Sequence, residues 1–258
     1  MSGNAFKDYD ISLATHKDYL RTRDLLKALF PKIAAAGSTQ FFESGYLWQT
    51  NNNKNDLDFV VELDKQSVIK IVESHPTIFQ TYRKFGNTVS TLFRVGNRLI
   101  HVDLMPTVNI ENEAWIMSGG STAIKGILRN LLLCFLARVK SDMLSASSGH
   151  EVKWTIAFPG GIGQRHNGLC LERETSPSFI LGYLGIEATS HQIELSRTFE
   201  GLSSLVSWDN DMQSIEKFKE YAKEQWLFKK SPGIFEDAFD YLEKTHATNK
   251  SVCYNITV

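Results

Sequence analysis

Apolar residues recur at two different spacings in the first part of the chain. Within residues 16–30 they follow the three- and four-residue spacing of a helix, which Pro31 then ends. The aromatic-rich stretch 38–49 and the segment 56–63, DLDFVVEL, favour β-strands, and a polar loop at 49–55 separates them. We therefore expect the chain to open with a helix and two strands.

A further helix and a hairpin are expected next. Asp64 is a favourable N-cap for a helix over residues 65–74, because its carboxylate can accept hydrogen bonds from the first-turn amides. Two strand-like segments, 87–95 and 98–105, flank the dipeptide Gly96–Asn97, which is typical of a two-residue hairpin turn. Strands and helices in this order predict a mixed β-sheet covered by helices.

The rest of the chain has mainly helical patterning. A nearly apolar segment follows Ser121 and Thr122 and continues to about Lys140, which is typical of a central buried helix. A linker is expected at 145–150, followed by a strand at 152–158 and a second hairpin. The C-terminal third then carries apolar residues at helical spacing.

These patterns predict an α+β protein in two parts. Residues 1–115 are expected to form a core with a mixed β-sheet and helices. Residues 116–258 are expected to form a mostly helical half that contains a β-hairpin and packs on the core. A chain of 258 residues is long enough for either one large domain or two modest ones.

Composition and charge bear on the partners and the cellular compartment of the protein. The formal net charge is -1, so no global basic field indicates nucleic-acid binding. The three cysteines are widely separated and show no metal-ligand spacing, which favours a reducing compartment. The N-terminus has no apolar signal region, and no stretch has the apolar length of a membrane span. These features predict a cytoplasmic protein without a membrane partner, and they carry no information on its oligomeric state.

Three aspartates stand out against the apolar strands. Asp56 and Asp58 are two positions apart, so both side chains lie on one face of their strand. Asp103 lies inside an apolar strand expected beside it, and His101 shares the face of Asp103. Carboxylates on one face repel one another unless they are solvated or share a cation. The two readings are a polar loop that ends at a strand and a site for Mg²⁺ (or Mn²⁺), which prefers oxygen ligands.

The arrangement resembles the DNA polymerase β-like nucleotidyltransferase superfamily. The matching pieces are GST at 37–39 or ESG at 43–45, DLDFVVEL at 56–63 and HVDLM at 101–105, within a stretch of roughly 16–140. The resemblance implies that Asp56, Asp58 and Asp103 are catalytic and hold Mg²⁺, and that a Gly-Ser turn contacts the triphosphate of a nucleoside triphosphate. A nest of backbone donors in such a turn suits a phosphate.

Two turns compete for the phosphate-binding role. Gly37–Ser38 has the residue order of the family but lies far ahead of Asp56, whereas Ser44–Gly45 is better spaced but reversed. We favour Gly37–Ser38, and the alternative is that Gly37 only ends the first helix.

Two basic residues are further candidates for nucleotide binding. Lys125 and Arg129 are four positions apart and are expected to share one face of the apolar helix. In similar enzymes, basic residues on the helix after the third aspartate neutralise the triphosphate. The alternative is a face near solvent, with the charged ends of both side chains extending into water.

The function predicted from the sequence is a metal-dependent nucleotidyl transfer that releases pyrophosphate. The acceptor is open: an RNA end, a second nucleotide, a protein or a small molecule. One alternative is a non-catalytic relative of the same fold that binds nucleotides or proteins. The other is a metal-dependent phosphohydrolase or nuclease, in which a fourth ligand such as His101 would join the metal.

Overall fold

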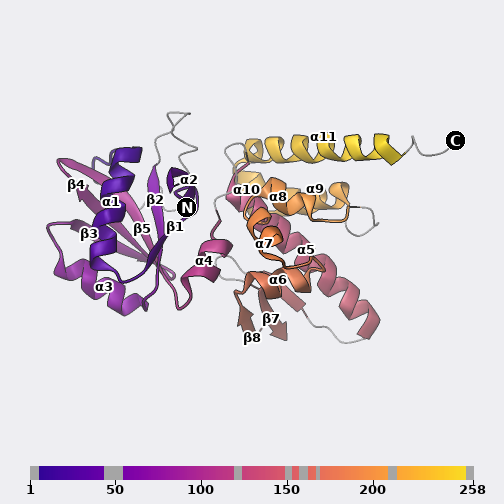
Figure 1. Ribbon diagram of the computed structural model, residues 1–258, viewed down its shortest axis with the longest axis horizontal. Coiled ribbons are helices and arrows are strands. Elements are labelled where there is room, and N and C mark those ends of the chain that lie inside the picture. The colour runs from indigo at the N-terminus through magenta and orange to yellow at the C-terminus, as the bar shows by residue number, and fades with distance from the viewer. Residues whose placement is uncertain are drawn as a thin grey trace. The chain divides into compact units, whose positions relative to one another are not determined.

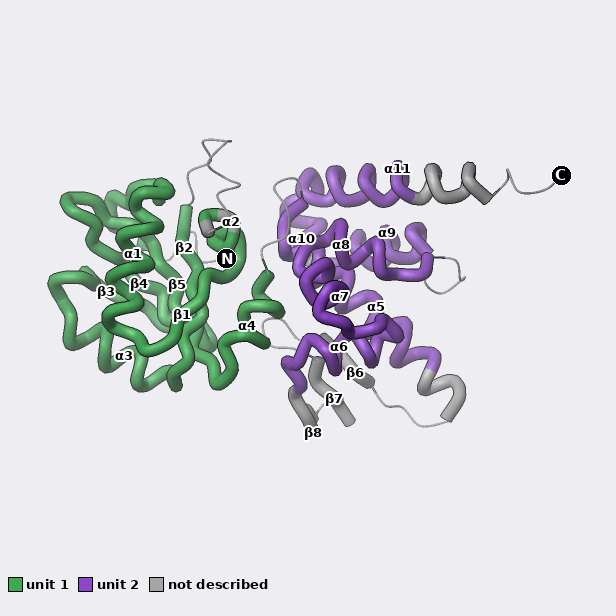
Figure 2. Tube along the Cα trace, in the orientation of Figure 1, with its two compact units in different colours: residues 1–119 green, residues 120–258 purple. Residues whose placement is uncertain are grey.

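The computed structural model describes residues 6–43, 55–118, 124–148, 153–156, 162–166, 169–208 and 214–253. The chain folds into two compact units, Met1–Gly119 and Gly120–Val258 (Figure 2), and each is considered by itself. The division lies slightly later than the predicted 115/116, because Ser118 still pairs with Gly37 of unit 1 in a parallel β-bridge.

Unit 1 is built on a five-stranded mixed β-sheet (Figure 1). In spatial order its strands are β1 (Ile33–Ala36), β2 (Asp56–Val61), β5 (Arg98–Pro106), β4 (Thr88–Val95) and β3 (Phe79–Phe85). Strands β2 and β5 are parallel, and the other neighbouring pairs are antiparallel. The helices of this unit are α1 (His16–Leu29), α2 (Gln40–Glu43), α3 (Lys65–Ser74) and α4 (Ile110–Ile116).

One face of the sheet forms the main core of unit 1. Alternate residues of β2, β5 and β4 point toward α1 and α3, and the buried side chains on this face include Leu57, Phe59, Val102, Val89 and Phe93. The opposite face carries the remaining strand positions, and it is the face on which Asp56, Asp58 and Asp103 lie. The alternation of the sequence thus separates the main core face from the face that carries the three aspartates.

Several local predictions for unit 1 are confirmed. The helix expected over residues 16–30 is α1, His16–Leu29, and Asp64 caps α3 by accepting hydrogen bonds from the amides of Gln66 and Ser67. Gly96 has a φ of 61° in the turn between β4 and β5, as a two-residue hairpin requires.

The strand predicted at 38–49 is wrong where the structure describes it. The strand of this region is the earlier Ile33–Ala36, and Gln40–Glu43 form the short helix α2. Phe42 is buried by helix packing, since it stacks on Tyr19 of α1 with ring centroids 5.3 Å apart. Strand β1 has a weak strand sequence and forms because it pairs with β2.

Unit 2 combines helices with a three-stranded antiparallel sheet of order β6-β7-β8. Its elements are α5 (Gly126–Ser148), β6 (Lys153–Ile156), β7 (Ile162–His166), β8 (Leu169–Glu174), α6 (Pro177–Tyr183), α7 (Ser190–Leu195), α8 (Phe199–Ser204), α9 (Ile215–Glu224), α10 (Trp226–Lys230), the 3-10 helix η2 (Pro232–Phe235) and α11 (Glu236–Cys253). Aromatic contacts tie α5 to α9, with Phe135 edge-on to the buried Phe218 at 5.5 Å.

The predicted central helix of unit 2 exists with different bounds. It begins at Gly126 and continues to Ser148, so residues 145–148 of the predicted linker are helical. No proline or glycine interrupts this stretch before Gly149, and serine and alanine are compatible with a helix end. The predicted Ser121 and Thr122 caps lie outside the described residues.

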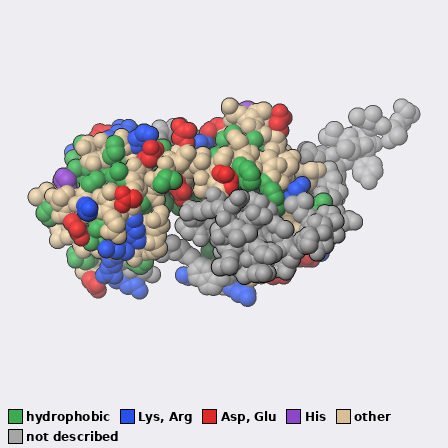
Figure 3. Space-filling view, turned by 90° about the horizontal axis from the view of Figure 1, so that it is seen from below, with side chains coloured by type: hydrophobic (Ala, Val, Ile, Leu, Met, Phe, Trp, Pro, Cys, Tyr) green, Lys and Arg blue, Asp and Glu red, His purple; other side chains and the backbone are tan. Residues whose placement is uncertain are grey.

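The surface of unit 1 carries both basic and acidic side chains. On the face of unit 1 shown in Figure 3, Lys and Arg side chains gather in one area, with Asp and Glu side chains beside them. Among the described helices, none has both the length and the apolar character needed to cross a membrane.

Candidate metal centre

Three carboxylates converge on one face of the sheet in unit 1. The parallel register of β2 and β5 places Asp58 opposite Asp103, and it places Asp56 opposite His101. One carboxylate oxygen from each of Asp56, Asp58 and Asp103 lies within 4.8 Å of the others. Asp103 is buried, with 6% of its surface exposed, while Asp56 and Asp58 are half-buried. The predicted convergence of the three acids is therefore confirmed.

Apolar clusters flank the carboxylates on the same face of the sheet. On one side, Val60 and Met105 pack with Ala36 and with Ala114 of α4. Further along β4 and β5, Phe6 of the N-terminal segment packs against Leu92, with Ile11 and Leu99 beside them. The acids thus form a polar interval between two apolar patches, where charge on the carboxylates is poorly compensated by water.

Asp103 is held by two neighbours. The Ser90 hydroxyl donates a hydrogen bond to Oδ1 of Asp103 at 2.5 Å, and Nε2 of His101 lies 2.9 Å from the same oxygen. Ser90 is opposite Asp103 in the β4–β5 hairpin, and His101 is two residues away on the same strand face. The orientation of this carboxylate is therefore determined by contacts within the sheet.

Gly37 lies directly against Asp58. It follows β1, whose last residue Ala36 pairs with Asp58. The φ of Gly37 is 52°, and a Cβ atom at this position would lie 2.6 Å from Oδ2 of Asp58. A glycine is required both by the backbone conformation and by the close approach of the carboxylate.

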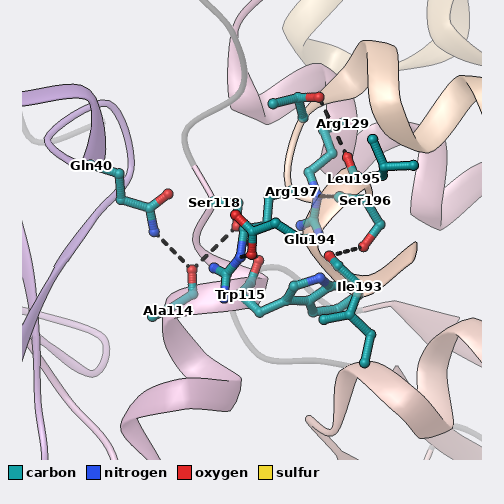
Figure 4. Close-up of polar contacts among 11 residues, drawn as sticks. Gln40, Ala114, Trp115, Ser118, Arg129, Ile193, Glu194, Leu195, Ser196 and Arg197 are labelled. Atoms are coloured by element: carbon teal, nitrogen blue, oxygen red, sulfur yellow. Dashed lines mark hydrogen bonds and ion pairs between the residues drawn. The ribbon is translucent and has the colours of Figure 1, made fainter. Parts of the chain in front are cut away.

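The Gly37–Ser38 turn is anchored on several sides. The amide of Gly37 donates to the carbonyl of Met117 at 2.6 Å, and the Thr39 hydroxyl accepts a hydrogen bond from the amide of Asp58 at 2.8 Å. In α2, which begins after the turn, Nε2 of Gln40 donates to the carbonyl of Ala114 at 3.0 Å (Figure 4). Of the two candidate turns, Gly37–Ser38 lies beside the carboxylates, and Ser44–Gly45 falls outside the described residues.

Lys125 and Arg129 do not share a helix face, so that prediction is wrong. Helix α5 begins at Gly126, which leaves Lys125 before the helix and exposed, whereas Arg129 is fully buried within unit 2. Nε of Arg129 donates to the carbonyl of Ser196 at 2.7 Å (Figure 4), and Nη1 donates to Oδ1 of Asn130 at 2.7 Å. Burial, with the nearby charge of Arg197, lowers the pKa of Arg129 to about 9.

Arg129 therefore has an internal role that the spacing of basic residues did not reveal. A guanidinium inside a protein is stable where hydrogen bonds replace its water, and the Ser196 carbonyl supplies one of them. Because Arg129 is fully buried, its side chain is not accessible to a phosphate, whereas phosphate binding by Lys125 stays a prediction.

Three residues near the carboxylates were not identified from the sequence: Thr39, Ser90 and Phe6. Ser90 had a usable signal, because a two-residue turn at Gly96–Asn97 pairs Val95 with Arg98 and thereby places Ser90 opposite Asp103. Thr39 and Phe6 had none, since both reach the site through tertiary packing.

The donor set fits a hard divalent cation. Carboxylate oxygens are the ligands that Mg²⁺ and Mn²⁺ prefer, and their spacing is on the scale of one or two hydrated ions with metal–oxygen distances of about 2.1 Å. Among the described residues, the group that could hold a metal consists of the three aspartates, and His101 is not part of it. The fourth ligand expected for the phosphohydrolase or nuclease alternative is therefore not found in this part of the chain.

Comparisons with known proteins add no relative to this picture. A scan against protein-family models finds no match for the chain, and a search of curated proteins finds none either. The sequence and the geometry of unit 1 are therefore the basis for assigning a function.

Proposed function

We propose that unit 1 is a metal-dependent nucleotidyltransferase of the DNA polymerase β-like kind. The observation that carries this proposal is the contact between Gly37 and Asp58, together with the convergence of Asp58 with Asp56 and Asp103. A phosphate-binding turn displaced from the carboxylates would have favoured a non-catalytic relative of this fold. Here the turn and the carboxylates are immediate neighbours.

The residues of the site have three roles in the proposed reaction: metal binding, triphosphate binding and proton acceptance. Asp56, Asp58 and Asp103 hold Mg²⁺ or Mn²⁺, and the Gly37–Ser38 turn binds the triphosphate through its backbone and the Ser38 hydroxyl. When bound, the metal supplies neutralisation of the phosphate charge and activation of the acceptor oxygen. Asp103 accepts the proton of the acceptor hydroxyl.

The acceptor oxygen forms a bond to the α-phosphorus of the nucleoside triphosphate. The bond between the α-phosphorus and the oxygen that bridges it to the β-phosphorus breaks. Pyrophosphate leaves with the electron pair of the broken bond. The protein contributes mainly by positioning the reactants and by matching their charge, because the bond changes occur between the substrates themselves. The acceptor class stays open among an RNA end, a nucleotide, a protein and a small molecule.

Pyrophosphate release tests the proposal directly. Wild-type protein is incubated with Mg²⁺ and with ATP, GTP, CTP or UTP in turn, with and without an RNA oligonucleotide, and is compared with Asp58→Asn. We expect the substitution to lower the rate at least about 100-fold, because it removes a charged metal ligand. Asp24→Asn is the control, since Asp24 is an exposed residue of α1, with 66% of its side chain accessible.

Each outcome distinguishes one function. Equal rates for wild type and Asp58→Asn would contradict the proposal. Release of orthophosphate from the triphosphate, or cleavage of the RNA, would favour the phosphohydrolase or nuclease alternative. Triphosphate binding without any turnover would favour the non-catalytic one.

A further inference from the structure

The buried carboxylate of Asp103 receives two hydrogen bonds on a single oxygen. Ser90 donates to Oδ1 from the neighbouring strand, and His101 approaches Oδ1 through Nε2. Ser90, His101 and Asp103 are each at most 6% exposed, so water competes little for these bonds. A carboxylate that holds a cation only accepts hydrogen bonds, so the proposed role of Asp103 requires His101 to donate from Nε2.

His101 is itself held in place by the N-terminal segment. The ring of Phe6 meets the ring of His101 edge-on, with centroids 5.4 Å apart and planes at 81°. Phe6 is 1% exposed and packs against Leu92, whose backbone pairs with His101 in the hairpin. The guanidinium of Arg83 lies 5.4 Å from the centroid of the Phe6 ring.

An ion pair extends this arrangement along the N-terminal segment. Arg83 lies 3.6 Å from the carboxylate of Asp8, two residues after Phe6. Residues 6–8 are thereby attached to β3 and β4, although they are far from the carboxylates in sequence. The ring of Phe6 thus contacts His101, and His101 in turn contacts the carboxylate of Asp103.

We propose that His101 and Ser90 are positioning residues for Asp103, and that Phe6 of the N-terminal segment acts through His101. This role rests on the proposed function, in which Asp103 is a metal ligand. Groups that hydrogen-bond to metal ligands set the orientation of those ligands, and their loss typically lowers metal affinity about 10- to 100-fold. The N-terminal segment is therefore part of the metal centre without contacting the metal.

The hairpin offers a matched pair of substitutions. Ser90 and Thr91 are consecutive buried residues of β4, and each hydroxyl makes one hydrogen bond, to Asp103 and to the carbonyl of Val102 respectively. Their side chains lie on opposite faces of the sheet. Ser90→Ala therefore removes a bond to the carboxylate, whereas Thr91→Val removes a comparable buried bond without touching it.

The test is a calorimetric titration of the full chain with Mn²⁺ at one fixed neutral pH. We expect His101→Ala and Ser90→Ala each to weaken Mn²⁺ binding about 10- to 100-fold, and Phe6→Ala to weaken it in the same direction. His101→Gln should recover most of the affinity, because its amide nitrogen donates from about the position of Nε2. Thr91→Val should bind Mn²⁺ as wild type does, and Asp58→Asn serves as the reference for loss of the site.

Thermal unfolding of every variant, followed by circular dichroism, identifies the temperature at which all are folded. Wild-type affinity in His101→Ala and Ser90→Ala would overturn the positioning role while leaving the proposed function intact. Equal weakening in Ser90→Ala and Thr91→Val would overturn it as well, since general destabilisation would then explain both. Absence of Mn²⁺ binding by the wild type would overturn the metal centre and the positioning role together.

Discussion

At Gly37 the backbone has a positive φ, and the carboxylate of Asp58 lies where a side chain would begin. A single position thus joins a turn suited to phosphate and a ligand suited to a cation. Asp103 also depends on its surroundings, because Ser90 and His101 both contact its Oδ1. The site therefore depends on the absence of a side chain at Gly37 as much as on the presence of the three carboxylates.

Gly37 and Gly86, which have nearly the same φ, allow the effect of backbone strain to be distinguished from an effect on the carboxylates. Gly37 and Gly86 have φ values of 52° and 53°, but the position of a Cβ atom is open at Gly86 and blocked by Asp58 at Gly37. We expect alanine at either position to lower the free energy of unfolding by about 1–2 kcal/mol. Only Gly37→Ala should also weaken Mn²⁺ binding, because its methyl group displaces the Asp58 carboxylate.

Urea unfolding and a Mn²⁺ titration of both variants measure the two effects. Unchanged Mn²⁺ affinity in Gly37→Ala would show that the Asp58 carboxylate does not need this contact.

A second residue-scale prediction concerns pH. Burial by itself would raise the pKa of Asp18, but hydrogen bonds from the amide and hydroxyl of Thr15 and the charge of Arg98 outweigh it and hold the pKa below its usual value of 3.8. A carboxyl with a lowered pKa in the folded state stabilises the fold above its unfolded pKa, and this stabilisation is lost as the pH falls through the folded pKa. Asp18→Asn should therefore be less stable than wild type at neutral pH, by about 2 kcal/mol.

The difference between Asp18→Asn and wild type should shrink as the pH is lowered below about 4, since the wild-type carboxyl then becomes neutral too. Urea unfolding at pH values on both sides of this point measures it. Asp24→Asn, which alters an exposed ion pair with Arg23, should change stability little under either condition. A difference for Asp18→Asn that stayed constant with pH would contradict the expected linkage.

At the scale of elements, the short helix α2 helps to fix the position of the Gly37–Ser38 turn. It is too short to be stable alone, so its position depends on contacts with α1, α4 and β2. Nε2 of His16 lies 3.2 Å from the carbonyl of Phe42, Gln40 reaches Ala114, and Thr39 bonds the amide of Asp58. The aromatic content of residues 38–49 predicted a strand, but the choice between strand and helix at Gln40–Glu43 depended on these contacts.

Two buried threonines test the attachment of this turn. Thr39 accepts the hydrogen bond from Asp58, whereas the hydroxyl of Thr22 in α1 has no hydrogen-bond partner among the described residues. Both side chains are fully buried. We expect Thr39→Val to lower the free energy of unfolding by about 1 kcal/mol and Thr22→Val to leave it unchanged or to raise it.

Chemical denaturation of the two variants side by side gives the comparison. Equal stability changes would indicate that the hydrogen bond between the turn and β2 contributes nothing beyond the volume of the side chain.

At the scale of the whole molecule, each unit has an aromatic core of its own. Phe93 is fully buried under α1 and α3 in unit 1, and Phe218 is fully buried among the helices of unit 2. The residues of the metal centre, from Gly37 to Asp103, all belong to unit 1. We therefore expect the stability of unit 2 and the proposed metal binding by unit 1 to be separable properties.

Truncation of the two buried phenylalanines should show this separation. We expect Phe218→Ala and Phe93→Ala each to destabilise its own unit by about 3–5 kcal/mol. Under conditions where both units remain folded, Phe218→Ala should keep wild-type Mn²⁺ affinity. Differential scanning calorimetry and Mn²⁺ titration measure the two properties, and weakened Mn²⁺ binding in folded Phe218→Ala would show that the units are coupled.

Taken alone, the order of residues determined much of unit 1. The Asp64 cap of α3, the Gly96–Asn97 hairpin and the shared face of Asp56 and Asp58 depend on interactions within a few positions of the chain, so local patterns were sufficient. The sequence also indicated Asp103 as the third acid, because a carboxylate in an apolar strand requires compensation.

Only the tertiary structure decided the parallel register that sets Asp58 against Asp103, the approach of Gly37 to Asp58, the burial of Arg129 in unit 2 and the support of His101 by Phe6. Each of these joins segments that are distant in sequence, and the packing of whole elements selects among many arrangements that local patterns permit equally.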